Sequence, residues 1–215
     1  MPAKRSGTKS RSPRDQSSKE RAGYHHGDLR RVLLDAATDA IESEGLDALS
    51  LRGIAARAGV SHAAPYRHFA DKDALIAALA EAGFDELRED VARAAARGRD
   101  GVGRLVEAAV AYVDFAARRG GRYEVMFRHR RTGVAAHVAA SDRAFYGLAA
   151  LIESAQAAGE LPAVGRDDMA RAAWALVHGL SELVRTDRLG VDDAGDLGRL
   201  TRLAARALIE GFGGR

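Results

Sequence analysis

The sequence predicts an all-α protein of about nine helices, in which a small N-terminal unit precedes a larger C-terminal bundle. The 215 residues are 47% apolar but only 6% aromatic, and this Ala- and Leu-rich composition favours helix over sheet. Apolar side chains recur at the three- and four-residue spacing of buried helix faces through most of the chain. Glycine-containing breaks separate these segments, and no strand-like alternation bounded by turns is present.

The composition also excludes several classes of function. Because the chain has no Cys, disulfides and thiolate metal sites are impossible. No apolar run reaches the roughly 18 to 20 residues of a membrane span, and the N-terminus lacks the apolar stretch of a secretory signal, so we expect a cytoplasmic protein without membrane contact. The glycine-rich phosphate loop, His-Glu-x-x-His and Gly-x-Ser-x-Gly motifs are missing, which argues against an enzyme and against a cofactor.

Residues 1–23 differ from the rest of the chain in composition and charge. They carry seven basic residues against Asp15 and Glu20, a net charge of +5, without helical periodicity. Because the whole chain carries +3, the remaining residues carry −2. We therefore predict a disordered basic arm suited to an electrostatic grip on nucleic acid, with a solubilising tail as the alternative.

The N-terminal unit is predicted over residues 24–75 as three helices. Asp28 is expected to cap the first helix, and Gly45 to end it. Its apolar face consists of Leu29, Leu33, Ala36, Ala37, Ala40 and Ile41. This helix is expected to support the two shorter helices that follow it.

Residues 51–69 predict a helix-turn-helix. Apolar positions 51, 54, 55 and 58 mark one buried helix face, and Gly59 ends that helix because it takes positive φ without steric cost. Ser61 is expected to cap a second short helix that runs to Phe69. Two helices joined by such a turn place the second one in the DNA major groove.

The rest of the chain, residues 76–215, is predicted to be helical as well. Asp71 is expected to cap a long fourth helix over 72–97. Five further helices are predicted between glycine-containing breaks: 104–119, 122–131, 138–158, 166–188 and 194–212.

The helix-turn-helix and the residues after it resemble the tetracycline-repressor-like (TetR) family of transcription regulators. The shared pattern is Ala-x-x-Ala-Gly-Val-Ser, then Tyr-x-His-Phe-x-x-Lys-x-x-Leu, which here begins at Ala55 and ends at Leu75. The matched core, from about Asp28 to Leu75, covers under a quarter of the chain, but several fixed spacings agree together. The resemblance implies a DNA-reading domain joined to a helical domain that binds an effector and dimerises.

The resemblance also implies which residues contact DNA. Exposed positions around the turn are expected to face the bases: Arg52, Ser61, His62, Ala63, Ala64 and Arg67. Phosphate contacts are expected from Tyr66, His68 and Lys72, and such contacts fix register without reading sequence. Arg67 can donate to guanine O6 and N7 in parallel, worth roughly 1–3 kcal/mol of discrimination. A solvated surface arginine is the alternative for Arg52 and Arg67.

Two features near the DNA-reading unit depart from a simple pattern. Pro65 stands where many family members carry an aliphatic residue, and a helical proline clashes with the carbonyl four residues back. We therefore expect the third helix to start later or to be tighter, which leaves the register of base contacts open by one residue. His25 and His26 have no identifiable third ligand, so a phosphate-facing or solvated role is expected and no metal site.

A single short reading helix contacts few base pairs, so we expect a homodimer on a palindromic operator, with half-sites roughly 34–36 Å apart or a multiple of that. The resemblance implies that the last two helices pair between protomers as a four-helix bundle, and two apolar seams fit this. The seams are Met169, Ala173, Leu176, Leu180 and Leu183, then Leu197, Leu200, Ala204, Ala207, Leu208 and Gly211. The alternative is that both seams face the core of one protomer.

Residues 173–183 read Ala-Trp-x-x-x-His-Gly-Leu-x-x-Leu, which resembles the Trp-His-Gly variety of C-terminal domain in one branch of the family. Aromatic rings, a soft Met and one imidazole suit a mostly apolar pocket with few polar anchors. The candidate ligand-binding residues are Tyr112, Phe115, Tyr123, Met126, Phe127, Phe145, Trp174 and His178. Ordinary core packing with a structural histidine is the alternative.

The sequence therefore predicts a sequence-specific DNA-binding regulator, a homodimeric repressor that a small-molecule effector releases from its operator. The effector would tilt the long fourth helix and change the separation of the two reading helices. A constitutive DNA-binding dimer without an effector, and an activator of the same fold, are the alternatives.

Overall fold

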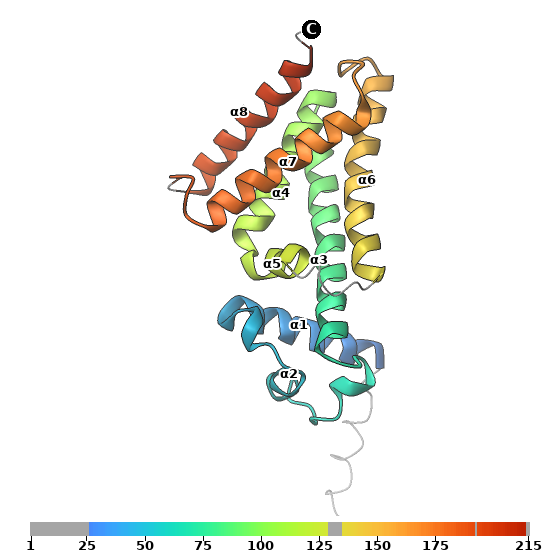
Figure 1. The fold of residues 1–215 in the computed structure, drawn as a ribbon, viewed down its shortest axis with the longest axis vertical. Coiled ribbons are helices and arrows are strands. Elements are labelled where there is room, and N and C mark those ends of the chain that lie inside the picture. Colours follow the sequence, from blue (N-terminus) through green and yellow to red (C-terminus); the bar gives the residue numbers. More distant parts are fainter. Residues whose placement is uncertain (1–25, 129–134, 192, 214–215) are drawn as a thin grey trace, which may run out of the picture.

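The structure is a computed structural model that describes residues 26–128, 135–191 and 193–213. Within these residues every regular element is helical (Figure 1), which confirms the predicted all-α class. The predicted basic arm, His25 and the end of the predicted helix 122–131 lie outside the described residues.

Eight α-helices follow one another in the described residues. They are α1 (His26–Glu44), α2 (Leu51–Arg57), α3 (Lys72–Ala95), α4 (Gly101–Arg118), α5 (Gly120–Arg128), α6 (Ala135–Ala157), α7 (Arg166–Arg185) and α8 (Ala194–Gly213). α1 begins at His26, so Asp28 lies inside its first turn and the prediction that Asp28 is the N-cap is wrong. α4 begins earlier than predicted because the Asp100 carboxylate caps it, accepting the Gly103 N–H at 2.6 Å.

The turn after α2 has the predicted geometry. The Gly59 N–H donates to the Ala56 carbonyl at 3.2 Å, and the Val60 N–H donates to the Ala55 carbonyl at 3.0 Å. Gly59 has φ of +68°, the left-handed region that favours glycine. This pair of hydrogen bonds is the Schellman arrangement, so Gly59 ends the first helix of the helix-turn-helix as predicted.

The segment after the turn is not the α-helix predicted between Ser61 and Phe69. Only Pro65–Arg67 form a helical turn, and that turn is 3₁₀. Because Pro65 has no N–H, it cannot donate to the Ser61 carbonyl as an α-helix requires, and that carbonyl accepts the Ala64 N–H instead, at 2.9 Å. The prediction that Ser61 caps a helix is wrong, whereas the later and tighter start expected from Pro65 is confirmed.

Helix α3 joins the two parts of the molecule, which we call the head (α1, α2, the 3₁₀ turn and the start of α3) and the body (the rest). Asp71 caps α3 as predicted, accepting the Ala74 N–H at 2.8 Å. Leu75 and Leu79 belong to the core of the head, and residues from Phe84 onward belong to a core of the body. Figure 1 shows α3 running as one helix from the head into the body.

Three residues of the apolar seams predicted for dimerisation are buried within the single chain. Met169 and Leu180 of α7 are 1% and 8% exposed, and Leu197 of α8 is 5% exposed, because α7 and α8 both pack on α4. The other seam residues are only partly buried or are exposed in the single chain, so pairing of the seams between two copies stays a prediction. Leu183 and Leu203 remain exposed, at 40% and 67%.

Helix α5 crosses α3 at Gly83, and this close approach generates a stability prediction. A Cβ at Gly83 would lie 2.8 Å from Sδ and 2.9 Å from Cγ of Met126, which is fully buried. We expect Gly83→Ala to lower the free energy of unfolding in urea by about 1–3 kcal/mol, the usual cost of overpacking. The control Gly147→Ala adds a Cβ with no atom within 4 Å and should be neutral or stabilising. Equal stability of the two variants would contradict the close packing of α3 and α5.

Candidate DNA-reading surface and ligand cavity

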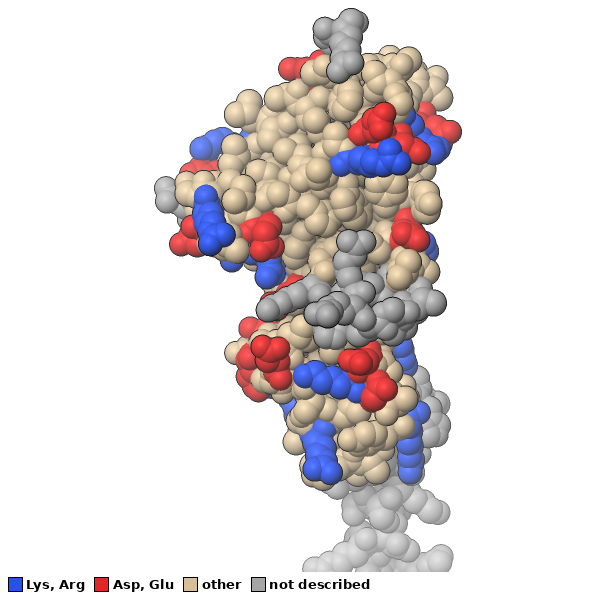
Figure 2. Space-filling model, viewed as in Figure 1, with Lys and Arg blue, Asp and Glu red and all other residues tan. Residues whose placement is uncertain are grey.

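The predicted DNA-contacting residues lie on neighbouring elements of the head. Those that are exposed are Arg52, Ser61, His62, Ala63, Tyr66 and Arg67, whereas Ala64, His68 and Lys72 are partly buried. Figure 2 shows Lys and Arg side chains along the lower margins of the head, the end farthest from the body. The head therefore presents exposed basic and polar side chains at the end farthest from the body.

Two of the three residues predicted to contact phosphate, His68 and Lys72, are partly buried in the head. Lys72 Nζ lies 3.5 Å from the carbonyl oxygen of Asp47, in the 3₁₀ turn Leu46–Ala48. His68 Nε2 is buried without a hydrogen-bond partner in the described part of the chain. Tyr66 is 52% exposed. Of the three residues, Tyr66 is thus presented most openly to a phosphate.

A cavity of about 420 Å³ lies in the body between α3, α4, α6, α7 and α8. Its lining consists mostly of Ala, Val, Leu, Ile and Met side chains, and the polar or charged lining residues are Tyr112, Trp174, Arg88 and Arg104. A volume of this size and an apolar lining with few polar groups are typical of small-molecule sites.

Two of the eight predicted ligand-binding residues, Tyr112 and Trp174, line this cavity. The others pack behind these two or in the adjoining cores: Phe115, Tyr123, Met126, Phe127, Phe145 and His178. The Trp174 ring stacks on His178 with centroids 5.0 Å apart, and Tyr112 lies 5.5 Å from the same imidazole. These rings form an aromatic wall of the cavity, and direct ligand contact by the six residues outside the lining stays a prediction.

His178 is held in one orientation by hydrogen bonds within the wall. Its Nδ1 lies 3.2 Å from the Trp174 carbonyl oxygen, and the Tyr112 hydroxyl lies 3.2 and 3.3 Å from Nδ1 and Nε2. Because a carbonyl can only accept, its contact is a hydrogen bond only in the tautomer with the proton on Nδ1, and Nε2 is then the nitrogen free to accept from the Tyr112 hydroxyl. This arrangement fits a structural histidine that fixes the Trp174 ring against the cavity.

The two tyrosines of the wall are neutral at physiological pH. Burial raises the pKa of Tyr112 well above its usual value, and the charge and hydrogen bond of Tyr123 raise it further. Burial likewise raises the pKa of Tyr123, against the opposing effects of the neighbouring Tyr112 and Ser181 hydroxyls and of the Arg185 charge. The wall therefore presents no negative charge to a ligand.

Among the described residues that line the cavity, the charged side chains are both arginines. Arg104 forms an ion pair with Glu160, and its side chain is 30% exposed. Arg88 lies 3.6 Å from Asp85 and is about half exposed. Neither acidic partner belongs to the lining. Sequence reasoning missed both arginines, because an arginine on a helix is usually a solvated surface residue.

Figure 2 shows a face of the body whose centre is free of charged side chains, with acidic and basic side chains at its margins. Helices α7 and α8 lie on this side of the molecule (Figure 1). Leu183 and Leu203 are exposed there, together with the small residues Ala175 and Gly179. Small and apolar exposed residues allow two helices to approach closely, so this surface is the best candidate for contact with a second copy of the chain.

In residues 26–128, 135–191 and 193–213, no group of three or more His, Asp or Glu residues is arranged to hold a metal ion. None of the described helices combines the length and the apolar character that crossing a bilayer requires.

Comparison with known proteins identifies both parts of the chain. The family model of bacterial regulatory proteins of the tetR family matches residues 33–79, and that of the tetracyclin repressor-like C-terminal domain matches residues 105–208. The first range contains the turn and the 3₁₀ segment, and the second contains most of the cavity lining. A protein of unknown function from Rhodococcus sp. RHA1 has a similar structure, with 35% identity and a TM-score of 0.76 over 87% of this chain and 99% of that chain.

Other relatives agree with this assignment. The HTH-type transcriptional repressor Rv3405c of Mycobacterium tuberculosis is 42% identical over 52 residues, which is 24% of this chain and 28% of that repressor. The chain thus matches little more than a quarter of that relative. FadR of Bacillus subtilis, solved with stearoyl-CoA, shares the fold at 16% identity and a TM-score of 0.70, over 84% of this chain and 98% of that chain. The chain belongs to the TetR family of bacterial regulatory proteins, with a tetracyclin repressor-like C-terminal domain.

Proposed function

We propose that this regulator is a homodimeric repressor that binds a palindromic operator and is released when a small molecule occupies the cavity of the body. The observation that carries this proposal is that α3 both lines the cavity and packs, through its first turns, in the core of the DNA-reading head. A ligand that tilts α3 changes the separation of the two heads of a dimer. A coupling of about 1–3 kcal/mol between the two sites is sufficient for a useful switch.

Two alternatives use the same fold. A constitutive DNA-binding dimer without an effector leaves the apolar cavity of about 420 Å³ without a role, so the structure favours a ligand-responsive regulator. An activator differs in where its operator lies relative to the promoter, and the geometry of the protein is the same in both cases. As a bacterial DNA-binding regulator, the protein is expected to act in the cytoplasm.

We assign residues 24–75 to the DNA-reading domain and residues 76–215 to a C-terminal domain of the Trp-His-Gly variety. Trp174 and His178 lie one turn apart on α7, with Gly179 next, and their stacked rings shape the cavity wall. This arrangement supports a role of the Trp-His-Gly pattern in forming the ligand site.

The cavity suits an effector with an extended apolar body and one anionic end. Arg104 and Tyr112 both line it from α4, and their spacing of eight residues corresponds to roughly 12 Å along the helix. An extended chain of about ten atoms spans this length. Glu160 engages the Arg104 Nη2 and leaves the Nε and Nη1 donors without a partner in the described residues. The stearoyl-CoA held by FadR is a ligand of this general kind.

The proposed DNA contacts predict two distinct mutant phenotypes. Arg67→Ala should lose roughly 1–3 kcal/mol of discrimination between a duplex selected from a random pool and a scrambled duplex. Lys72→Ala should weaken binding to both duplexes and reduce the slope of log affinity against log salt by about one. Fluorescence anisotropy across a salt series measures both quantities. If Arg67→Ala binds the selected duplex as tightly and as selectively as the parent, the proposed register of base contacts is wrong.

The proposed ligand chemistry can be tested with the emission of Trp174, which is the single tryptophan of the chain. Sodium decanoate should bind more tightly than 1-decanol by about tenfold, because a charged hydrogen bond to Arg104 is worth roughly 1.5–3 kcal/mol. Arg104→Gln should remove this preference. The control Arg171→Gln, at an exposed arginine that pairs with Asp168 outside the cavity lining, should keep it. Equal affinity of the wild-type protein for acid and alcohol would rule out an anionic effector end.

The proposed dimer surface can be tested by introducing a charge. Leu203→Glu on α8 should shift the protein toward monomers in light scattering, because an unpaired carboxylate opposes burial in an apolar interface. Tyr146→Glu is the matched control, since Tyr146 is exposed to a similar extent (64% against 67%) but lies on α6. Dimers that survive Leu203→Glu unchanged would place the interface elsewhere.

A further inference from the structure

Helix α5 belongs to the cores of both the head and the body. Val125 is 1% exposed and packs in the core of the head. Tyr123 and Met126 are buried in the core of the body, in contact with the aromatic wall of the cavity. Figure 1 shows α5 lying across the junction between the two parts, next to α1. A displacement of α5 therefore disturbs both cores.

The first turn of α5 is capped by a side chain of the head. Glu42, in the last turn of α1, accepts the Gly121 N–H through Oε2 at 3.1 Å and the Arg122 N–H through Oε1 at 3.0 Å. The first N–H groups of a helix have no partner inside the helix and form the positive end of its dipole, so a carboxylate is the favoured cap. Helix caps usually come from residues next to the helix in sequence, whereas Glu42 lies about 80 residues away.

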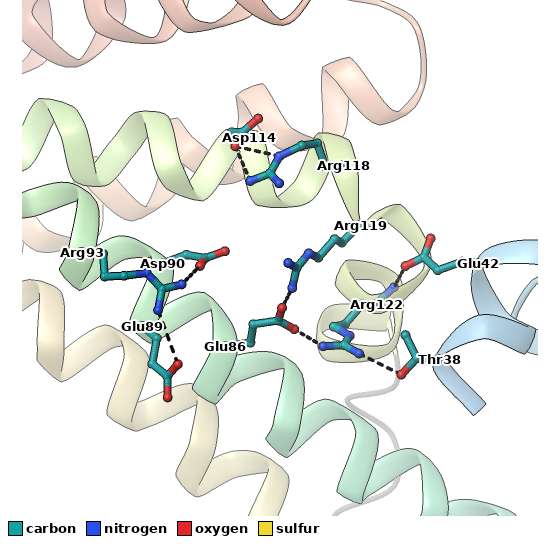
Figure 3. A network of polar contacts seen from close by, with 10 residues as sticks. All are labelled: Thr38, Glu42, Glu86, Glu89, Asp90, Arg93, Asp114, Arg118, Arg119 and Arg122. Atoms are coloured by element: carbon teal, nitrogen blue, oxygen red, sulfur yellow. Dashed lines mark hydrogen bonds and ion pairs between the residues drawn. The ribbon is translucent and has the colours of Figure 1, made fainter. Parts of the chain in front are cut away.

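A charged network fastens the same end of α5 to α3 and α1 (Figure 3). The Arg122 guanidinium pairs with Glu86 of α3 and donates to the Thr38 hydroxyl of α1 at 2.9 Å. Arg119, directly before α5, pairs with the other oxygen of the Glu86 carboxylate. Because these contacts involve α1, α3 and α5 together, no one of the three helices can shift without changing the hydrogen bonds of the others.

The backbone of α5 approaches α1 more closely than a side chain would allow. A Cβ at Gly121 would lie 2.8 Å from Ile41 Cγ2 and 3.1 Å from the Glu42 carboxylate. Ile41 is buried, with 4% of its surface exposed. Glycine at position 121 is thus what brings the first turn of α5 within hydrogen-bond distance of Glu42.

The opposite side of α5 contacts the wall of the cavity. The Phe127 ring lies 4.6 Å from the His178 imidazole, and Tyr123 lies 6.2 Å from the Tyr112 ring. Tyr112 and Trp174 are the wall residues that face the cavity. A ligand that displaces these two rings consequently pushes on α5 through His178 and Tyr123.

We propose that Glu42 is a positioning residue that couples the cavity to the DNA-reading head by capping α5 across the junction. The proposal rests on the function proposed above and specifies how the cavity regulates DNA binding. When no ligand displaces the aromatic wall, the capped α5 holds α1 in the orientation that binds DNA. Displacement of α5 by a ligand breaks the two hydrogen bonds of the cap, because such bonds weaken steeply when donor and acceptor separate or misalign.

The test measures amide hydrogen exchange at Gly121 and Arg122 in the full chain, with and without a duplex that the wild-type protein selects from a random pool. If the capped state is the one that binds DNA, the duplex stabilises the cap and slows exchange of these two amides by about fivefold or more, the lower end of typical coupling. Exchange reports rare openings of the cap, so the effect is measurable even when most free molecules are capped.

Glu42→Gln removes the charge and one of the two acceptor oxygens. We expect faster exchange at both amides and no slowing by the duplex, with thermal stability close to that of the wild type because Glu42 is exposed. Asp39→Asn is the matched control: it removes the same charge one turn earlier on α1, at an exposed carboxylate for which the described structure contains no side-chain contact. Gly121→Ala should reproduce the Glu42→Gln result by pushing α5 away from α1.

The outcomes separate this inference from the proposed function. Duplex-induced slowing in the wild type and in Asp39→Asn, but not in Glu42→Gln, supports the inference. A selected duplex that leaves exchange at Gly121 and Arg122 unchanged in the wild type, or slows it equally in Glu42→Gln, overturns the inference and leaves the proposed function standing. If the wild-type protein retains no duplex, the proposed function itself fails.

Discussion

The burial of one continuous helix in two cores is the constraint on which the rest of this structure depends. Helix α3 has 24 residues without a break, so Leu75 in the head and Phe84 in the body are parts of one rigid element. A helix of this kind transmits a rotation applied at one end to the other end. The close crossing of α5 at Gly83 and the ion pairs of Glu86 fix a second helix against it.

Most of the fold could be predicted from the sequence, because helical periodicity and capping residues are local properties. The predictions that Gly59 ends the helix before the turn and that Asp71 caps α3 are confirmed. A left-handed glycine at a helix end and an aspartate N-cap both act within a few residues of their own position, so a local sequence pattern is sufficient to identify them. The segment after the turn was predicted as an α-helix, and only Pro65 indicated the tighter 3₁₀ turn that the structure contains. Here the missing N–H of a single residue outweighed the family pattern.

The lining of the cavity was less predictable than the fold. Aromatic residues are few in this sequence and suggest a pocket, whereas aliphatic residues occur in every helix core and do not distinguish a pocket from a core. Some of the predicted pocket residues, such as Phe115 and Met126, are fully buried in a core. The cavity is lined chiefly by Ala, Leu and Val, which have the same pattern as any helix core. The use of the dimer seams could not be predicted for a related reason: apolar spacing identifies a buried face, but it does not tell whether the burying partner is the same chain or a second copy.

The claim that the cavity controls the reading heads is tested most directly by measuring the distance between the two heads of a dimer in solution. Since the chain has no Cys, Ala63→Cys provides a single site for a spin label on the exposed turn of each protomer. Pulsed dipolar spectroscopy of the dimer should give one distance population compatible with half-sites roughly 34–36 Å apart, or a multiple of that. That population should shift when decanoate occupies the cavity, as reported by Trp174. An identical distance distribution with the cavity empty and filled would contradict the claim that the cavity controls the reading heads.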